Sequence, residues 1–163
     1  MPKKDTFKLA AALLMLMVAG VFLFRFVLNE QAGGEKAFFY DLSEKKLFKA
    51  ARTAVPPIRG INDSIEDGVR AMVISVTGNP ADKSSWKIAY LERYSPELKQ
   101  QMEQAQATGD PPPMGRGLAQ MHRFVRRLET DEWFSLATPE GEAIVNGWIA
   151  LGTNGTTPVV CTP

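Results

Sequence analysis

The sequence predicts a small α+β domain, an antiparallel sheet of four to six strands with two packed helices, behind one N-terminal transmembrane helix. Three observations lead to this prediction. Residues 9–28 contain 18 apolar side chains in 20 positions, against 45% for the whole chain of 163 residues. Several short runs of β-branched and aromatic residues are separated by turn residues. Two later segments share a helix-start signature, Ser or Thr followed by Pro and Glu.

The apolar run from Leu9 to Leu28 has the length of a membrane span. At ~1.5 Å per residue, a helix of this length reaches ~30 Å, the thickness of a bilayer's hydrocarbon core. Basic residues precede the run and acidic residues follow it, so the positive-inside rule places the N-terminus in the cytoplasm. We therefore expect a single-pass inner-membrane protein with four parts. Residues 1–8 form a cytoplasmic stub, 9–28 the transmembrane helix, 29–36 a linker and 37–163 a periplasmic domain.

A cleaved secretory signal is the alternative interpretation of the same run. The best small-residue cleavage site ends at Gly20, and cleavage there would leave four apolar residues at the new N-terminus. We therefore favour an uncleaved signal anchor. Arg25 lies three residues from the outer end of the run, where its long side chain can reach the lipid headgroups.

Four strands are predicted in the first half of the domain. Residues 38–40 and 47–48 are aromatic-rich and are separated by a polar stretch with the length of a hairpin connection. Residues 69–77 read as a buried strand that pairs with residues 86–94. Simple alternation in the latter places Trp86, Ile88 and Tyr90 on one face.

Both helices are predicted in the second half. Ser95 caps the first, which ends at Gly109 and should pack a narrow apolar stripe on one face of the sheet. Thr138 caps the second, which has a broader apolar face and ends at Gly152. The segment 110–117 reads as a loop. Weaker strand patterns occur at residues 122–128, 132–136 and 158–161.

The net charge of +1 and the single cysteine argue against a nucleic-acid binder with a broad basic surface, a disulfide scaffold and a cysteine-ligated metal centre. Cys161 and His122 form a formal Cys–His pair. A thiol two residues from the chain end is poorly suited to a positioned catalytic site, so we interpret it as a small buried or free thiol. The acidic run at Asp63, Glu66 and Asp67 lacks the spacing of a calcium loop. We predict no catalytic residue, no metal site and no cofactor.

Two groups of side chains are candidates for binding. Arg123, Arg126 and Arg127 form the only basic cluster, and they would contact an anionic partner or a lipid headgroup. The simpler interpretation is an exposed strand edge, where arginines discourage pairing with other chains. The interface aromatics are the three tryptophans, although each could instead pack in the core. They are Trp86, Trp133 and Trp148.

The domain resembles a group of uncharacterised bacterial proteins that are small, have one N-terminal span and carry an envelope domain. The resemblance implies the architecture and a bacterial origin, and it is tied to no known chemistry. It rests on Phe39-Tyr40-Asp41-Leu42, Leu47-Phe48, Pro56-Pro57-Ile58, Asp67-Gly68-Val69-Arg70, Ala89-Tyr90-Leu91-Glu92 and Tyr94-Ser95-Pro96-Glu97.

Three hypotheses follow. The first is a non-enzymatic, membrane-anchored periplasmic accessory subunit, whose partners are the lipid bilayer and an envelope or membrane protein, with no nucleic acid. The second is a membrane-tethered hydrolase or transferase that uses two carboxylates, Glu92 and Asp67, facing each other across a cleft. The third is a module that binds an anionic lipid or ligand through the basic cluster. We favour the first.

Overall fold

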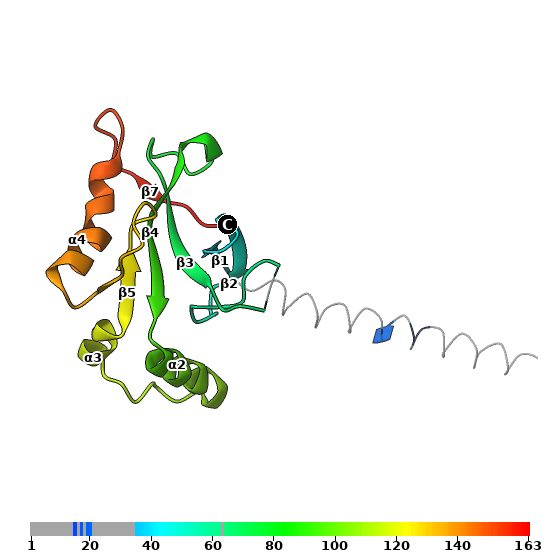
Figure 1. Cartoon of the computed structure of the whole chain (residues 1–163). Helices are drawn as coiled ribbons and strands as arrows, with labels where there is room; N and C mark the ends of the chain where they lie inside the picture. Colours follow the sequence, from blue (N-terminus) through cyan, green and yellow to red (C-terminus); the bar gives the residue numbers. More distant parts are fainter. Residues whose placement is uncertain (1–14, 16, 18, 21–34, 63) are drawn as a thin grey trace, which may run out of the picture. The chain divides into compact units, whose positions relative to one another are not determined.

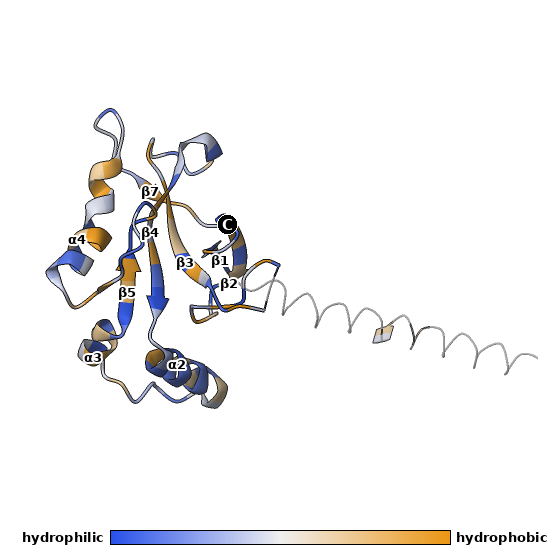
Figure 2. Ribbon diagram, viewed as in Figure 1, coloured by the Kyte–Doolittle hydropathy of each residue, from blue (hydrophilic) through white to orange (hydrophobic). Residues whose placement is uncertain are grey.

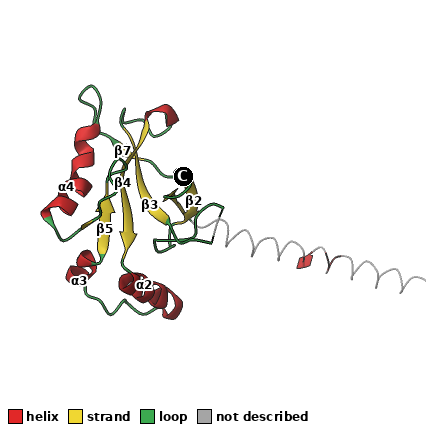
Figure 3. Ribbon diagram, in the orientation of Figure 1, coloured by secondary structure: helices red, strands yellow, loops and turns green. Residues whose placement is uncertain are grey.

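The structure, a computed structural model, describes residues 15, 17, 19, 20, 35–62 and 64–163. The chain divides into two compact units, residues 1–35 and 36–163. The second unit is α+β, as predicted: an antiparallel sheet with three described helices (Figures 1 and 3). Its strands are β1 (Lys36–Asp41), β2 (Lys46–Ala51), β3 (Gly68–Ser75), β4 (Trp86–Tyr94), β5 (Arg123–Arg126), β6 (Phe134–Ser135) and β7 (Val159–Val160). Its helices are α2 (Pro96–Thr108), α3 (Arg116–Met121) and α4 (Pro139–Gly147).

The seven strands exceed the four to six expected from the sequence. They run in the order β2-β1-β3-β4-β5-β6, and β7 pairs with β3. β4 pairs with residues 70–75 along one edge of β3, and β1 and β7 share the other edge. β1 lies beside residues 68–70 and β7 beside Ile74 and Ser75. The edge of β3 is thus covered by two different strands that come from opposite ends of the domain.

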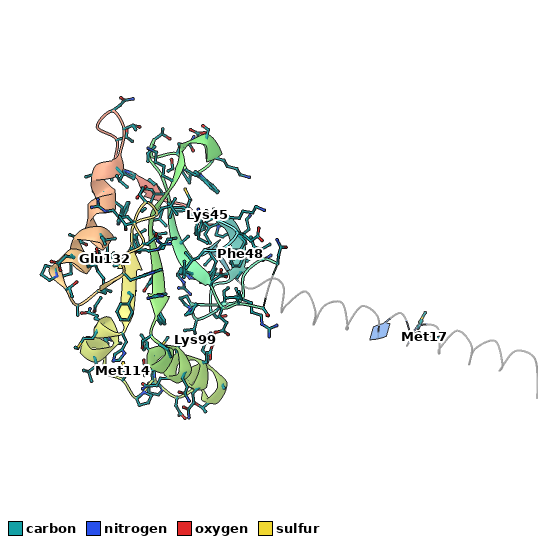
Figure 4. The ribbon with its side chains drawn as sticks, in the orientation of Figure 1. Met17, Lys45, Phe48, Lys99, Met114 and Glu132 are labelled. Carbon is teal, nitrogen blue, oxygen red and sulfur yellow. The ribbon has the colours of Figure 1, made fainter. Side chains whose placement is uncertain are left out.

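The predicted hairpin of β1 and β2 is confirmed, with Phe39 opposite Phe48. Figure 4 labels Phe48 and the turn residue Lys45. Its turn is closed by Lys45, which has a positive φ of 53°. Asp41, at the end of β1, is fully buried and accepts hydrogen bonds from the backbone N–H of Glu44 at 2.7 Å and of Ile61 at 2.6 Å. A buried carboxylate with this many donors ties the hairpin to the loop before β3.

The predicted pairing of β3 with β4 is confirmed, but the predicted faces of β4 are wrong. Val73 lies opposite Ile88 and Met72 lies opposite Tyr90, so Ala89 is an extra residue, a β-bulge. Side chains alternate with a period of two, and one extra residue reverses the alternation beyond it. Ile88 therefore faces one side of the sheet and Tyr90 faces the other.

Each face of the sheet has its own cluster of buried side chains. On the first face, Trp86 and Ile88 pack against a cluster made of Phe38, Val69, Ala71, Val73, Leu91 and Cys161. On the second face, Tyr90 and Val125 form a smaller cluster with Ile144 of α4. β4 thus contributes large side chains to both cores, and the bulge is the reason that Ile88 and Tyr90 lie in different ones.

The helix starts are confirmed in detail. Ser95 accepts a hydrogen bond from the N–H of Leu98, and Thr138 accepts one from the N–H of Gly141. However, α2 lies beyond the end of β4 instead of on a face of the sheet, and Leu98 is its only buried residue (Figure 1). Most of α2 is hydrophilic, whereas α4 carries apolar segments, which is why α4 covers the second face (Figure 2).

Two further differences concern the second half of the domain. The short helix α3 was not predicted; its six residues have no side-chain cap and none of them is buried. α4 ends at Gly147, and the chain continues to Gly152 as a 3₁₀ helix (Trp148–Leu151). The apolar pattern of the predicted second helix is thus divided between two helix types.

The predicted transmembrane helix at residues 9–28, the cytoplasmic stub and most of the linker lie outside the described residues; only Met15, Met17, Ala19 and Gly20 of the span are described. Within the described part of the chain, no helix combines the length and the apolar character that crossing a membrane requires.

Candidate functional site

Strand β4 is longer than its neighbour β5. It has nine residues, but β5 pairs with only its last four, residues 91–94. The β5–β6 loop makes no backbone hydrogen bond with residues 86–90 in the described part of the chain. We call residues 86–90 the open edge of β4. Backbone N–H and C=O groups along such an edge are available to a further strand.

An open groove of about 510 Å³ lies beside this edge. One wall is β4 itself, and the other is formed by α4 and the 3₁₀ helix. The residues that line this β4 groove are Lys87, Ile88, Ala89, Arg127, Glu129, Thr130, Ile144, Gly147, Trp148 and Leu151. Apolar side chains therefore form the helical wall, while charged residues come from β4 and the β5–β6 loop.

The position of the helical wall depends on a close approach between α4 and β6. Thr138 donates a hydrogen bond from its hydroxyl to the carbonyl of Ser135 at 2.8 Å. Gly141 is buried, and a Cβ atom at this position would collide with the backbone of Ser135. Only glycine therefore allows the first turn of α4 to lie this close to β6.

The structure separates the three arginines of the predicted basic cluster. Arg126 is buried, with 7% of its surface exposed, and it donates hydrogen bonds to the carbonyl of Thr130 and to the carboxylate of Asp131. Arg123 pairs with Glu92 at 2.6 Å. Arg127 alone is exposed and lines the β4 groove. The expected exposed strand edge is wrong, because β5 lies between β4 and β6.

The three tryptophans also have different surroundings, and all are half-buried. Trp86 packs edge-on against Phe38, with 5.4 Å between ring centroids. Trp133 lies against the guanidinium groups of Arg93 and Arg126, at 4.4 and 5.1 Å from its ring centroid. Burial, together with the like charge of Arg126, lowers the pKa of Arg93. Trp148 is the tryptophan that lines the groove.

The two proposed catalytic carboxylates interact with different groups. Glu92 is 6% exposed, and its Oε1 accepts a hydrogen bond from Arg123 Nε at 2.6 Å. Asp67 accepts a hydrogen bond from the N–H of Ser43 at 3.0 Å. Their contacts give each carboxylate a structural partner, and no contact between the two is present among the described residues.

His122 and Cys161 are likewise not in contact. Cys161 belongs to the first-face cluster, and burial raises the pKa of its thiol. His122 Nδ1 lies 2.9 Å from the hydroxyl of Ser95, a Ser–His contact that the sequence did not reveal. That hydroxyl already accepts the N–H of Leu98 as a helix cap. Glu97 lies on the same side of the imidazole, 3.9 Å from Nδ1, so both polar neighbours share one ring nitrogen. A nucleophile–base–orienter chain would need partners on both nitrogens.

The described residues contain no cluster of three or more metal-ligating side chains. What the structure brings together is the open edge of β4, an apolar helical wall and two of the predicted residues, Arg127 and Trp148. The sequence missed the open edge because it depends on where β5 stops. Comparison of the chain with protein-family models, with curated proteins and with solved structures finds no match.

Proposed function

We propose that this protein is a non-enzymatic, single-pass protein of a bacterial inner membrane whose periplasmic domain binds a membrane or envelope protein through the β4 groove. In this role it acts as an accessory subunit of a larger assembly. The observation that carries the proposal is the open edge of β4 facing the apolar wall of α4 and the 3₁₀ helix.

The groove suits an extended segment of the partner. Five residues of unpaired strand offer ~17 Å of backbone hydrogen-bonding edge, enough for one short strand to add to the sheet. Trp148 and Leu151 would contact the side chains of that strand that face the helices. A large aromatic residue at the centre of a small interface often supplies much of its binding energy.

The charges around the groove define the partner's chemistry further. Lys87 and Arg127 are exposed cations on its lining, and Glu129 is the single anion there. A segment with apolar residues and at least one Asp or Glu complements this arrangement. Every copy carries the Ala89 bulge, so two β4 edges do not match in a regular ladder, which favours a different partner over self-association.

Site-specific photo-crosslinking of the full chain in native membranes tests the proposal. A photoreactive residue is placed at Lys87 or Leu151 in the groove, and at the exposed α2 residue Gln104 as the matched control. We expect one discrete adduct from both groove positions, mapped to an extended segment of the partner, and none from Gln104. The same adduct from Gln104, or none from the groove positions in a correctly inserted protein, would overturn the proposal.

Amide hydrogen exchange provides the second measurement. The N–H groups of residues 86–90 that point toward the groove should exchange fast in the free protein, because they have no strand partner on that side. On binding, they should become protected while the amides of α2 remain unchanged. Protection that is absent from β4 but present elsewhere would place the partner at a different surface.

A further inference from the structure

A second cavity lies on the other side of the domain, where β1 and β7 share the edge of β3. Its volume is about 200 Å³, and it is open to solvent. β1 contributes Lys36 and Ala37, and the middle of β3 contributes Arg70 and Met72. Glu92 and Tyr90 of β4 form one side, on the second face of the sheet, and Arg52 and Thr162 also line the cavity. We call it the Arg70 cavity.

Arg70 is held rigidly in this cavity. Its Nη2 donates hydrogen bonds to the carbonyls of Arg52 and Ala54, both at 2.8 Å. Its guanidinium also lies over the ring of Phe39, 5.6 Å from the centroid. Nε is buried and has no hydrogen-bond partner. These contacts orient the guanidinium without neutralising it, because carbonyls and aromatic rings carry no net charge.

The charge in the cavity is therefore unbalanced. Among the described residues that line it, Glu92 is the one carboxylate, and Arg123 already pairs with it at 2.6 Å. No carboxylate lies within 4.0 Å of the Arg70 side chain among the described residues. Lys36 and Arg52 are further basic residues of the lining. A half-buried guanidinium with no counter-charge is costly unless an anion binds it.

Apart from the charged residues, Tyr90 and Thr162, the lining is apolar. Ala37, Ala71, Met72 and Val160 surround the space next to Arg70. The volume is below the ~300–1,000 Å³ typical of pockets for drug-sized ligands, so the occupant must be small. A bare, strongly hydrated anion would gain nothing from these side chains, whereas an anion that carries a short apolar arm would bury the arm against them.

We propose that the Arg70 cavity binds the oxyanion of a small amphiphile, a carboxylate or phosphate joined to an apolar arm. Arg70 binds the oxyanion, Lys36 adds favourable charge at the opening, and Met72 and Val160 contact the arm. This site is independent of the β4 groove and uses none of its residues. Two sources supply such a group, a free short-chain acid or an anionic phospholipid.

The test uses the full chain in nanodiscs of phosphatidylcholine, with hexanoate as the probe and isothermal titration calorimetry as the measurement. We expect saturable binding of hexanoate to be weakened about tenfold by Arg70→Lys, which keeps the charge but loses the planar fork of donors. Lys36→Glu changes an exposed side chain and leaves folding intact, and it should weaken binding about tenfold as well. Lys49→Glu, an exposed position on β2 outside the cavity, is the charge-matched control and should change the affinity less than twofold.

Nanodiscs that contain phosphatidylglycerol distinguish the two sources. If the headgroup occupies the cavity, hexanoate should bind about tenfold more weakly in these discs, and Lys36→Glu should abolish the difference between the two lipid compositions. If a free acid is the occupant, the lipid composition should have no effect on the affinity. The absence of hexanoate binding in both disc types, or an equal loss in Lys36→Glu and Lys49→Glu, overturns the proposal.

Discussion

The two halves of strand β4 differ in how many of their backbone hydrogen-bonding groups have a partner strand. Leu91 and Glu92 have a strand on either side, β5 continues along residues 93–94, and a polar network includes the pair of Glu92 with Arg123. Residues 86–90 have β3 on one side and a groove on the other. The Ala89 bulge lies within the open half, close to the point where β5 pairing begins. Within one continuous strand, the paired half holds the sheet together and the open half leaves backbone groups free for a partner.

The largest effect is expected from truncating the core residue of the paired half. Leu91→Ala leaves a cavity in the first-face cluster, where Leu91 is completely buried. We expect the free energy of unfolding to fall by about 4 kcal/mol, which urea unfolding would report. Ile88→Ala, at a half-buried residue of the open half, is the matched control and should cost about 1–2 kcal/mol. A loss at Ile88 as large as the loss at Leu91 would contradict the difference between the two halves.

A substitution in α4 can shift the helical wall without changing any residue of β4. Gly141→Ala places a methyl group against the backbone of Ser135, so α4 must shift away from β6. We expect a loss of about 3 kcal/mol in urea unfolding. Gly147→Ala, at the other end of the same helix, meets no atom within 4 Å and should stabilise by up to about 1 kcal/mol. Equal effects at the two positions would contradict the close approach of α4.

In the paired half, Glu92→Gln removes the negative charge that Arg123 needs. We expect a loss of about 2 kcal/mol, since Glu92 is buried whereas Arg123 remains partly exposed to solvent. The matched control is Glu103→Gln on α2, an exposed partner of Lys99, which should cost less than about 0.5 kcal/mol. Urea unfolding of both variants compares them directly. If Glu92→Gln leaves the free energy of unfolding unchanged, strand pairing alone stabilises this half.

Acid should weaken the same end of the sheet through Asp41. Burial raises the pKa of this carboxyl, but the N–H donors of Glu44 and Ile61 and the hydroxyl of Ser43 outweigh it, and the pKa falls below its ordinary value of 3.8. A lowered pKa in the folded state stabilises the protein above pH 3.8, and this stabilisation disappears as the pH falls through the folded value. Asp41→Asn should cost about 1–2 kcal/mol at neutral pH. Thermal unfolding between pH 7 and pH 2 should show the difference between variant and wild type shrinking toward acid, and a constant difference would contradict this role.

The smallest effect on stability is expected in the open half. Leu151 is 44% exposed, so Leu151→Ser should change the unfolding free energy by less than about 1 kcal/mol. The same change should strongly reduce the photo-crosslink formed from Lys87, because it removes part of the apolar wall. Gel quantification of the adduct, with Ile149→Ser as an exposed control outside the groove lining, checks this. If Leu151→Ser forms as much adduct as the wild type, Leu151 is not part of the binding surface.

Local patterns predicted most of the elements. The signatures at Ser95 and Thr138 located both long helices, and hydrophobic runs located β1 to β4. α3 escaped prediction because it has neither a side-chain cap nor a buried face. The faces of β4 were wrong because a bulge depends on the partner strand, which a period-two pattern in one strand does not contain.

The candidate binding residues were predicted only in part. Trp148 and Arg127 do line the groove, but Arg123 and Arg126 are committed to Glu92 and Asp131. The sequence does not distinguish these three neighbouring arginines. Which of them is free to bind a partner depends on which ones form ion pairs with carboxylates. Arg70 carries no sequence signal at all. The carbonyls that hold it belong to residues 16 and 18 positions away, and only the fold shows that no carboxylate of the described residues pairs with it.

By itself, the sequence determined the class of the domain, its strand-rich first half and the starts of its helices, because these follow from local periodicity and from backbone groups that a neighbouring side chain must cap. Only the tertiary structure decided where β5 ends along β4, which charges are paired and where cavities remain. Those features arise from strands and loops distant in the chain, and their energies depend on burial and distance. The β4 groove and the Arg70 cavity are both features that only the tertiary structure decided.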